Sequence, residues 1–311
     1  MIELYKLVNN KNALPGSTYP YNSFAIRSYM ELNTSFARTH FVFGISSNEL
    51  EYLKTANILE AELRIYRLWV NLEDETFAPL ITPPYFLLKV YQVTDIEHLE
   101  TPDIQILLNV HYVSYFNFGW QIFNIKSALQ SWISGDKPNL GLLIIATTLF
   151  GDNLCVEFSR RDFQENVLQP IVIVYEGKTK DLSSQNLKSD ENVYSSINNY
   201  SKIKIDTTTL PCQRNDFYIN FTTLGWSDFI LEPIAYNAYR CTGNCKYSLN
   251  FKWTNYAAIK TLLYELKMDN VTNSCCVPNA LMPLNILYYS DLNTIILKRY
   301  DQMIIEDCTC K

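Results

Sequence analysis

The spacing of the cysteines constrains this chain more than any other feature of its sequence. Seven of the eight cysteines lie within the last 100 residues. Cys241 and Cys245 enclose three residues with a central glycine, and Cys308 and Cys310 enclose one, so disulfides at these sites can close a small covalent ring. A third disulfide can pass through that ring only if no side chain blocks the hole, which is the physical use of Gly243. The pattern predicts a cystine knot.

The odd cysteine count indicates a bond to a second molecule. The seven cysteines of the last 100 residues cannot all pair with one another, and a leftover cysteine in a secreted chain is typical of an intermolecular disulfide. Cys275 and Cys276 are adjacent and cannot readily bond each other without strain, so one of them must point elsewhere. The alternative is a thiolate metal site. Adjacent cysteines and a glycine-centred ring fit tetrahedral zinc ligation poorly, so we expect no metal.

Length, charge and hydropathy narrow the class of protein. A chain of 311 residues favours two domains that each bury a core. The net charge of −6 argues against a nucleic-acid binder. The longest uninterrupted apolar run extends from Leu140 to Ala146, far short of the roughly 20 residues that span a membrane. We therefore expect no membrane insertion.

Hydrophobic periodicity predicts strands in the amino-terminal half. Residues 59–69 alternate apolar and polar side chains, which is typical of a half-buried strand. Two short apolar runs, 141–146 and 171–175, are bounded by turn residues and predict further strands. Within 125–133, Ile125, Leu129 and Trp132 have helical spacing.

Composition also predicts the domain boundaries. From about Glu176 to Asp206 the chain is dominated by Lys, Asp, Ser and Asn, which indicates a polar linker. We therefore expect a first domain at residues 1–176, a linker at 177–206 and a second domain at 207–311.

The residues around the cysteines resemble a known family. Segments 212–221, 224–230, 275–278, 286–289 and 298–311 are similar to the mature part of a transforming growth factor β superfamily ligand precursor, in its bone morphogenetic protein-like branch. Within the first domain, segments 61–67, 120–125, 138–142 and 169–175 resemble the propeptide of such precursors. The resemblance implies a mainly β fold: a β-rich propeptide arm domain plus a carboxy-terminal cystine-knot growth factor with one long helix. The alternative for the first domain is an unrelated β-sandwich.

The resemblance also implies roles for the cysteines. The implied bridges are Cys212–Cys276, Cys241–Cys308 and Cys245–Cys310. Cys275 is implied to join its copy in a second chain across a two-fold axis. Because about 100 residues with exposed strands bury little apolar surface, these bonds are expected to substitute for a core.

Residues 254–266 predict the helix of the second domain. Thr254 is an N-cap candidate, and Ile259, Leu262, Leu263 and Leu266 form one apolar stripe. Because a knot has little interior, we expect the stripe to face a partner chain. The alternative is that the helix packs only on its own chain.

Receptor surfaces follow from the resemblance. Trp226, Asp228 and Phe229 stand where such ligands present an aromatic patch to the type I receptor, and large aromatics make effective binding hot spots. A core role for Trp226 is the alternative. The implied type II receptor surface consists of apolar strand residues: Leu287, Tyr289 and Leu297.

Secretion is expected for a disulfide-rich chain. Its first residues lack the basic start and apolar segment of a signal peptide, so we expect the true start to lie upstream. Four glycosylation sequons begin at Asn33, Asn199, Asn220 and Asn270. The eighth cysteine, Cys155, falls in a predicted strand at 153–158, where a buried free thiol is the ordinary explanation and a bond to another propeptide or a matrix carrier the alternative.

The function implied by the resemblance is a secreted dimeric growth factor or cytokine that binds type I and type II receptor serine/threonine kinases and triggers SMAD signalling. The expected partners are a second copy or a related ligand, those receptors and extracellular antagonists. The alternative is a secreted cystine-knot antagonist that sequesters such ligands. The three histidines lie in no catalytic motif and no phosphate-binding glycine loop occurs, so we expect neither catalysis nor a cofactor.

Overall fold

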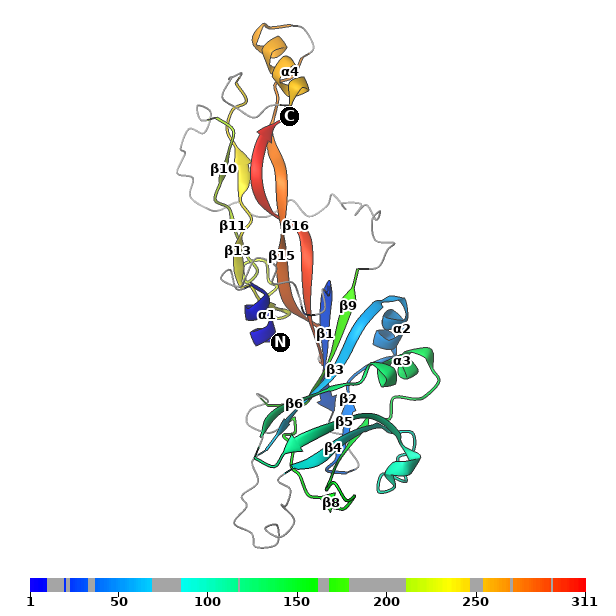
Figure 1. Cartoon of the computed structure of the whole chain (residues 1–311). Helices are drawn as coiled ribbons and strands as arrows, with labels where there is room; N and C mark the ends of the chain where they lie inside the picture. Colours follow the sequence, from blue (N-terminus) through cyan, green and yellow to red (C-terminus); the bar gives the residue numbers. More distant parts are fainter. Residues whose placement is uncertain are drawn as a thin grey trace. The chain divides into compact units, whose positions relative to one another are not determined.

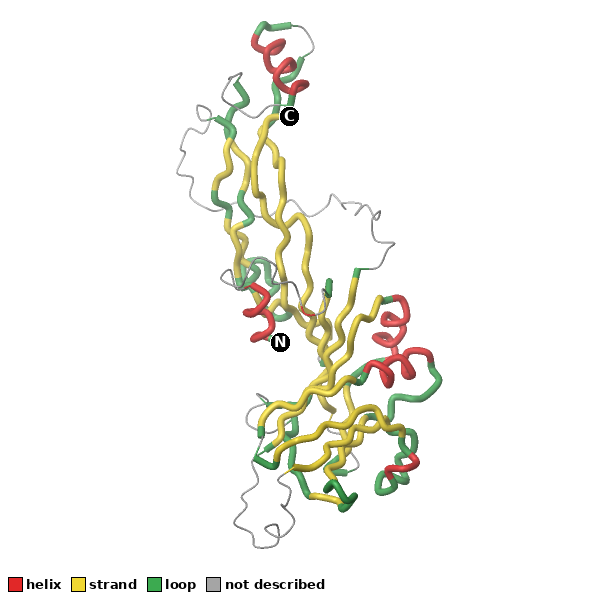
Figure 2. The backbone as a smooth tube through the Cα atoms, viewed as in Figure 1, coloured by secondary structure: helices red, strands yellow, loops and turns green. Residues whose placement is uncertain are grey.

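The computed structural model describes residues 1–9, 20, 23–32, 37–68, 85–116, 118–161, 168–178, 211–246, 254–268, 271–291 and 293–311. The chain forms two compact units (Figure 1). The first comprises Met1–Lys180 and Tyr288–Lys298, and the second comprises Asp181–Leu287 and Arg299–Lys311. Strands are the predominant secondary structure of the described backbone in both units (Figure 2), so the mainly β prediction is confirmed.

The first unit is built on two sheets that share strand β1 (residues 25–32). Its helices are α1 (Ile2–Asn9), α2 (Ser47–Thr55), the 3-10 turn η3 (Pro102–Ile104) and α3 (Lys126–Ser134). Its strands are β1 (Ala25–Leu32), β2 (His40–Phe43), β3 (Asn57–Arg67), β4 (Tyr85–Gln92), β5 (Ile106–Ser114), β6 (Gly119–Asn124), β7 (Leu142–Thr147), β8 (Asn153–Leu154) and β9 (Ile171–Gly177).

Strand β1 belongs to both sheets. Residues 25–30 of β1 pair with β9, and the order continues through β3 to β6. Residues 31–32 of β1 pair with β2, and that order continues through β7 to β4 and β5. All of these pairs are antiparallel. A single core of aromatic and aliphatic side chains from both sheets fills the space between them.

The predicted elements of this unit are confirmed. The period-two segment forms β3, in which Ala61, Leu63 and Ile65 are buried. The two apolar runs form β7 and β9. Helix α3 buries Leu129 and Trp132 against the core and ends at Gly135, whose φ of 81° is the left-handed conformation that favours glycine.

The interpretation of Cys155 as a buried thiol in a strand is wrong. Strand β8 ends at Leu154, and Cys155 follows it with an exposed, unpaired thiol. The sequence Asn153–Phe158 alternates as a strand would, but only its two ends are paired: Asn153 and Leu154 with β7, and Phe158 with Arg67. Cys155 has no ladder partner among the described residues.

A long hairpin continues the first sheet. Strands β15 (Cys276–Asp291) and β16 (Thr294–Cys310) pair with each other. The hairpin residues Tyr288–Lys298, which the sequence assigned to the second domain, group with the first unit. There, residues 294–298 of β16 pair antiparallel with residues 25–29 of β1.

The second unit is held by short ladders and disulfides. Strand β10 (Gln213–Asn215) pairs with β14 (Arg240–Thr242), β11 (Tyr218–Asn220) pairs with β13 (Ala235–Asn237), and β12 (Ile230–Glu232) pairs with β15. Its helix is α4 (Asn255–Glu265). The buried cluster at its centre consists of half-cystines: Cys212, Cys245, Cys308 and Cys310. Disulfide bonds thus stabilise the centre of this unit, as an apolar core does in a larger domain.

Candidate functional site

Three disulfides join the ends of the strands in the second unit. The Cα–Cα distances are 5.4 Å for Cys212–Cys276, 5.7 Å for Cys241–Cys308 and 5.9 Å for Cys245–Cys310. These pairs coincide with those that the resemblance implies. The last two bonds close a ring from residues 241–245 and 308–310.

Gly243 lies where the chain that enters the first disulfide meets this ring. Its φ of 123° is one that side chains rarely adopt. A Cβ at this position would overlap the carbonyl oxygen of Pro211 and lie 2.9 Å from the Cα of Cys212. The amide of Cys212 donates to the carbonyl of Asn244 at 3.2 Å, which fixes this close approach. Only glycine fits both the space and the backbone.

The metal-site alternative fails on chemistry. The sulfur atoms of Cys212, Cys245 and Cys310 lie within 4.8 Å of one another, close enough to share an ion. All three are disulfide-bonded, however. Zinc binds the thiolate form of cysteine, which a disulfide cannot supply.

Cys275 is exposed and unpaired. Its backbone is fixed by two hydrogen bonds with Lys311, of 2.8 and 3.0 Å. The thiol is therefore held at a defined place beside the knot and open to solvent.

Helix α4 turns its apolar stripe to solvent. The Thr254 hydroxyl accepts a hydrogen bond from the amide of Ala257 at 3.2 Å, so the N-cap prediction is confirmed. The buried face of the helix is small: Ala257 and Thr261, with the Thr261 hydroxyl 2.8 Å from that of Ser274. On the stripe, Ile259 is 60% exposed and Leu266 is 64% exposed. Among the described residues, none covers this stripe.

The aromatic side chains of the 221–230 loop form a stack that is half exposed. Trp226 is 45% exposed and stacks on buried Phe221 at 6.0 Å, with Phe229 at 5.8 Å and 41% exposed. Phe221 in turn stacks on Tyr236 at 5.7 Å, and burial raises the pKa of the Tyr236 phenol. The amide of Trp226 donates to the carbonyl of Phe221 at 2.9 Å. One face of Trp226 is therefore anchored and the other is open.

Of the four remaining predicted surface residues, two are exposed and two are buried. Asp228 is exposed in the same loop, and Tyr289 is 36% exposed. Leu287 and Leu297 are fully buried, so the expectation that they form an exposed surface is wrong for this chain. Leu297 lies opposite Ile26 of β1, a pairing between segments far apart in the sequence that no local pattern reveals.

One predicted glycosylation site can be located. Asn220 is exposed at the end of β11, and its side-chain oxygen accepts from the amide of Thr222 at 2.8 Å. Asn33, Asn199 and Asn270 lie outside the described residues, as does most of the predicted linker.

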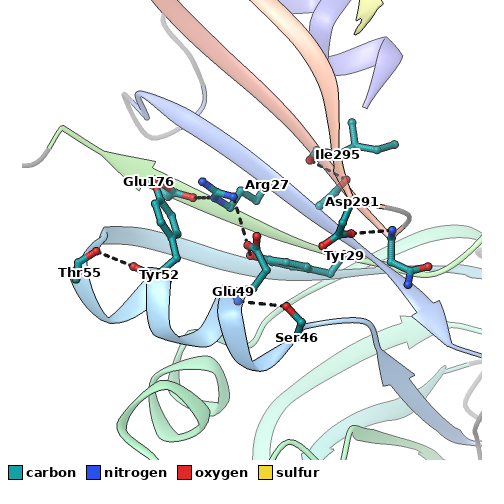
Figure 3. A network of polar contacts seen from close by, with 11 residues as sticks. Arg27, Tyr29, Ser46, Glu49, Tyr52, Thr55, Glu176, Asp291 and Ile295 are labelled. Atoms are coloured by element: carbon teal, nitrogen blue, oxygen red, sulfur yellow. Dashed lines mark hydrogen bonds and ion pairs between the residues drawn. The ribbon is translucent and has the colours of Figure 1, made fainter. Parts of the chain in front are cut away.

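Sequence reasoning missed the polar residues that join β1 to its neighbours. Arg27 forms ion pairs with Glu49 of α2 and Glu176 of β9 (Figure 3). The only local sequence signal for the position of Glu49 is Ser46, the N-cap of α2. Its hydroxyl accepts a hydrogen bond from the amide of Glu49 at 3.2 Å. Arg27 and Glu176 are 149 residues apart, so nothing in the sequence links them.

Comparison with known proteins assigns both units. Residues 8–171 match the TGF-beta propeptide family, and residues 211–310 match the transforming growth factor beta like domain. The chain belongs to the transforming growth factor β family. The resemblance inferred from the sequence, to a ligand precursor of the bone morphogenetic protein-like branch, is confirmed, as is the expectation that the chain is not an enzyme.

Relatives in this family align over most of the chain. It is 27% identical to bone morphogenetic protein 4 of Gallus gallus over 290 residues, which cover 88% of this chain and 66% of that protein. It is 26% identical to bone morphogenetic protein 4 of Rattus norvegicus, with coverage of 87% and 66%, and 26% identical to the protein DVR-1 homolog of Strongylocentrotus purpuratus, with coverage of 66% and 49%. The chain thus spans less than two thirds of the length of these relatives. Within the described part of this family member, no helix is long and apolar enough to cross a membrane.

Proposed function

We propose that this chain is the precursor of a secreted, disulfide-linked dimeric growth factor that binds type I and type II receptor serine/threonine kinases and triggers SMAD signalling. The observation that carries the proposal is the combination of an exposed, unpaired Cys275 with an exposed apolar stripe on α4. In a secreted chain whose other knot cysteines are all bonded, a fixed surface thiol is explained by a partner thiol. The stripe needs a partner that removes it from water.

A second copy is the partner that satisfies both features. A two-fold contact brings the same residue of each chain together, so one exposed cysteine is enough for one interchain bond. The apolar stripe of α4 supplies area that a second copy, or a related subunit, would cover. It consists of Ile259, Leu262, Leu263 and Leu266. A related ligand with the same cysteine would form a heterodimer by the same chemistry.

The receptor surfaces rest on the exposed residues. We assign type I receptor binding to Trp226, Asp228 and Phe229, because an aromatic ring anchored on one face and open on the other is a preorganised hot spot. We assign type II receptor binding to the surface around Tyr289.

Glycosylation at Asn220 and the predicted division into propeptide, linker and growth factor belong to the same proposal. Residues 1–176 would act as the propeptide that assists folding, and 207–311 as the signalling part. Extracellular antagonists would compete for the same surfaces as the receptors.

The second candidate function is a cystine-knot antagonist that captures such ligands. Both candidates use binding surfaces, so the discriminating experiment is a binding experiment. The chain is expressed with a cleavable signal peptide, and the secreted protein is passed over immobilised type I and type II receptor ectodomains and over an immobilised bone morphogenetic protein. Saturable binding to the receptors supports the growth factor. Binding to the ligand alone would favour the antagonist.

A further inference from the structure

A glycosylation sequon begins at the last residue of strand β11. It consists of Asn220, Phe221 and Thr222, and Tyr218 stands two residues before the asparagine. Asn220 is exposed, and its side-chain oxygen accepts a hydrogen bond from the amide of Thr222 at 2.8 Å. The side-chain nitrogen, Nδ2, is the atom that carries an N-linked sugar, and it has no hydrogen-bond partner among the described residues. A sugar on Nδ2 would therefore break no hydrogen bond within that part of the chain.

The pairing of β11 with β13 assigns Asn220 and Tyr218 to one face of this ladder. Tyr218 lies opposite Asn237, and Asn220 lies opposite Ala235. Side chains of directly opposed residues share a face of the sheet, as do those of residues two apart on one strand. We call this the tyrosine face, and it consists of Tyr218, Asn220, Ala235 and Asn237.

The opposite face of the ladder carries the aromatic stack that includes Trp226. Ile219 lies opposite Tyr236 there, and Phe221 stacks on Tyr236 at 5.7 Å. Trp226 in turn stacks on Phe221 at 6.0 Å. Asn220 stands between Ile219 and Phe221 in the sequence, so its side chain points away from that stack. A group attached to Asn220 therefore leaves the ladder on the side away from Trp226.

Tyr218 offers a bare aromatic ring beside the attachment point. It is 70% exposed, and its side chain has no hydrogen bond, ion pair or ring contact within the described part of the chain. Residues two apart on a strand are about 7 Å apart along it, a distance that a sugar linked to Asn220 bridges. The C–H groups of a sugar ring pack on an aromatic face through dispersion and weak C–H contacts. The ring is therefore placed to receive the first sugar.

The two residues of β13 on this face leave the space above the ring open. Ala235 is small and exposed. Asn237 is half-buried, and its side-chain oxygen accepts hydrogen bonds from the amides of Phe217 and Tyr239 at 3.0 and 3.1 Å. The tyrosine face thus has room for a sugar.

We propose that Asn220 carries an N-linked glycan whose first sugar rests on the ring of Tyr218. The glycan shields the tyrosine face, while the Trp226 surface stays free for the type I receptor. This inference rests on the proposed function, because sequons are glycosylated in secreted chains. The new bond joins Nδ2 of Asn220 to C1 of a sugar that is carried on a lipid pyrophosphate. The bond from C1 to the phosphate oxygen breaks, the amide gives up one proton, and the lipid pyrophosphate leaves.

Mass spectrometry of the secreted precursor, before and after peptide-N-glycosidase, tests the attachment. Two variants remove the glycan by different routes. Asn220→Gln removes the acceptor, whereas Thr222→Ala removes the hydroxyl of the sequon and keeps the bond from Asn220 to the backbone amide. Thr222→Ser keeps the sequon and is the control. We expect the glycan in the wild type and in Thr222→Ser alone, and an unmodified Asn220 in the wild type would overturn the proposal.

Two measurements test the contact between the sugar and Tyr218. Tyr218→Ala should raise amide hydrogen exchange in β11 and β13 at least about threefold more in the glycosylated chain than in either glycan-free variant, with β3 unchanged. In hydroxyl-radical footprinting, loss of the glycan should raise the oxidation of Tyr218 several-fold and leave that of Trp226 unchanged. Equal exchange effects in all chains, or equal oxidation of Tyr218, would show that the sugar does not rest on the ring.

Binding to the type I receptor ectodomain separates the glycan from the proposed function. The glycosylated chain and the glycan-free Thr222→Ala variant should bind with the same affinity. Tighter binding of the glycan-free chain would show that the glycan covers the Trp226 surface, which contradicts the proposal. If neither chain binds while the mass and footprint results hold, the proposed function is wrong and the glycan site stands.

Discussion

The cystine knot requires glycine at position 243. A side chain there collides with backbone atoms of Pro211 and Cys212, and backbone cannot rotate aside as a flexible side chain can. We expect Gly243→Val to abolish secretion, because the Cys212–Cys276 bond then cannot form beside the closed ring. The measurement is the amount of disulfide-linked product in the medium. Normal secretion of the valine variant would show that the ring does not require glycine. The matched control is Gly151→Val, in an exposed turn of the other unit, where a Cβ would meet no atom within 4 Å.

Trp226 is the residue on which the receptor assignment depends most. Its indole is anchored on Phe221 and open on the other face, so Trp226→Ala should leave the fold and the dimer intact. A hot-spot loss of about 2 kcal/mol corresponds to an affinity for the type I receptor that falls about thirtyfold.

The control for this variant is Tyr218→Ala. Tyr218 is a more exposed aromatic residue on neighbouring β11. We expect it to bind the type I receptor with unchanged affinity. If Trp226→Ala is misfolded or Tyr218→Ala loses the same affinity, the assignment of Trp226 as a specific contact fails.

At the scale of elements, β1 depends on Arg27. Burial alone would lower the pKa of this guanidinium, but the charges of Glu176 and Glu49 and the neighbouring tyrosines raise it above its usual value, so Arg27 stays charged at every pH at which the protein is folded. Arg27→Leu leaves the buried carboxylate of Glu176 and the mostly buried one of Glu49 without their cation. We expect the unfolding free energy of the first unit to fall by about 3–5 kcal/mol.

Denaturant unfolding of the secreted precursor measures this loss. The exposed pair of Lys54 and Glu51, 2.6 Å apart, is the control, because Lys54→Ala removes an ion pair of the same chemistry in water. Equal, small effects for both variants would contradict the role given to Arg27.

The elements show where sequence reasoning succeeds and where it stops. Strand β3 and helices α3 and α4 follow from local periodicity and caps, which the chain carries within a few residues. The burial of Leu287 and Leu297 depends on the tertiary environment of the hairpin, and Arg27 finds Glu176 across 149 residues. Such burial and pairing are set by the assembled sheets, so no local pattern predicts them. Cys155 was misjudged for the same reason, because it lies past the end of β8 and has no ladder partner among the described residues.

At the scale of the whole molecule, the lack of arginine between Glu176 and Pro211 predicts slow processing. A protease pocket built for bidentate guanidinium recognition discriminates against lysine, and the only close basic pairs there are Lys178 with Lys180 and Lys202 with Lys204. Arg160 and Arg161 are engaged with Glu31, within the first unit. We expect the secreted product to remain mostly uncut.

Amino-terminal sequencing of any small secreted fragment checks the processing. The variant Lys202→Arg with Ile205→Arg creates the protease site Arg-Ile-Lys-Arg in the linker and should be cut in the same cells, which shows that the protease is present. Efficient furin-dependent release of a wild-type fragment that starts between Asp181 and Asp206 would overturn the prediction.

The proposed dimer depends on two features, the Cys275 disulfide and the apolar stripe of α4. If Cys275 makes the only interchain bond and the α4 stripe covers its copy, Cys275→Ser should still associate through the stripe in native buffer. Adding Leu266→Arg should dissociate it, because a charge then enters an apolar contact. Sedimentation of the single and double variants separates the two contributions.

The most direct test of the account is a denaturing gel of the secreted protein, run with and without reductant, for the wild type and for Cys275→Ser. We expect the wild type to migrate as a dimer without reductant and as a monomer with it, while Cys275→Ser migrates as a monomer in both lanes. A covalent dimer that persists in the Cys275→Ser variant, or a wild type that is monomeric without reductant, would contradict it.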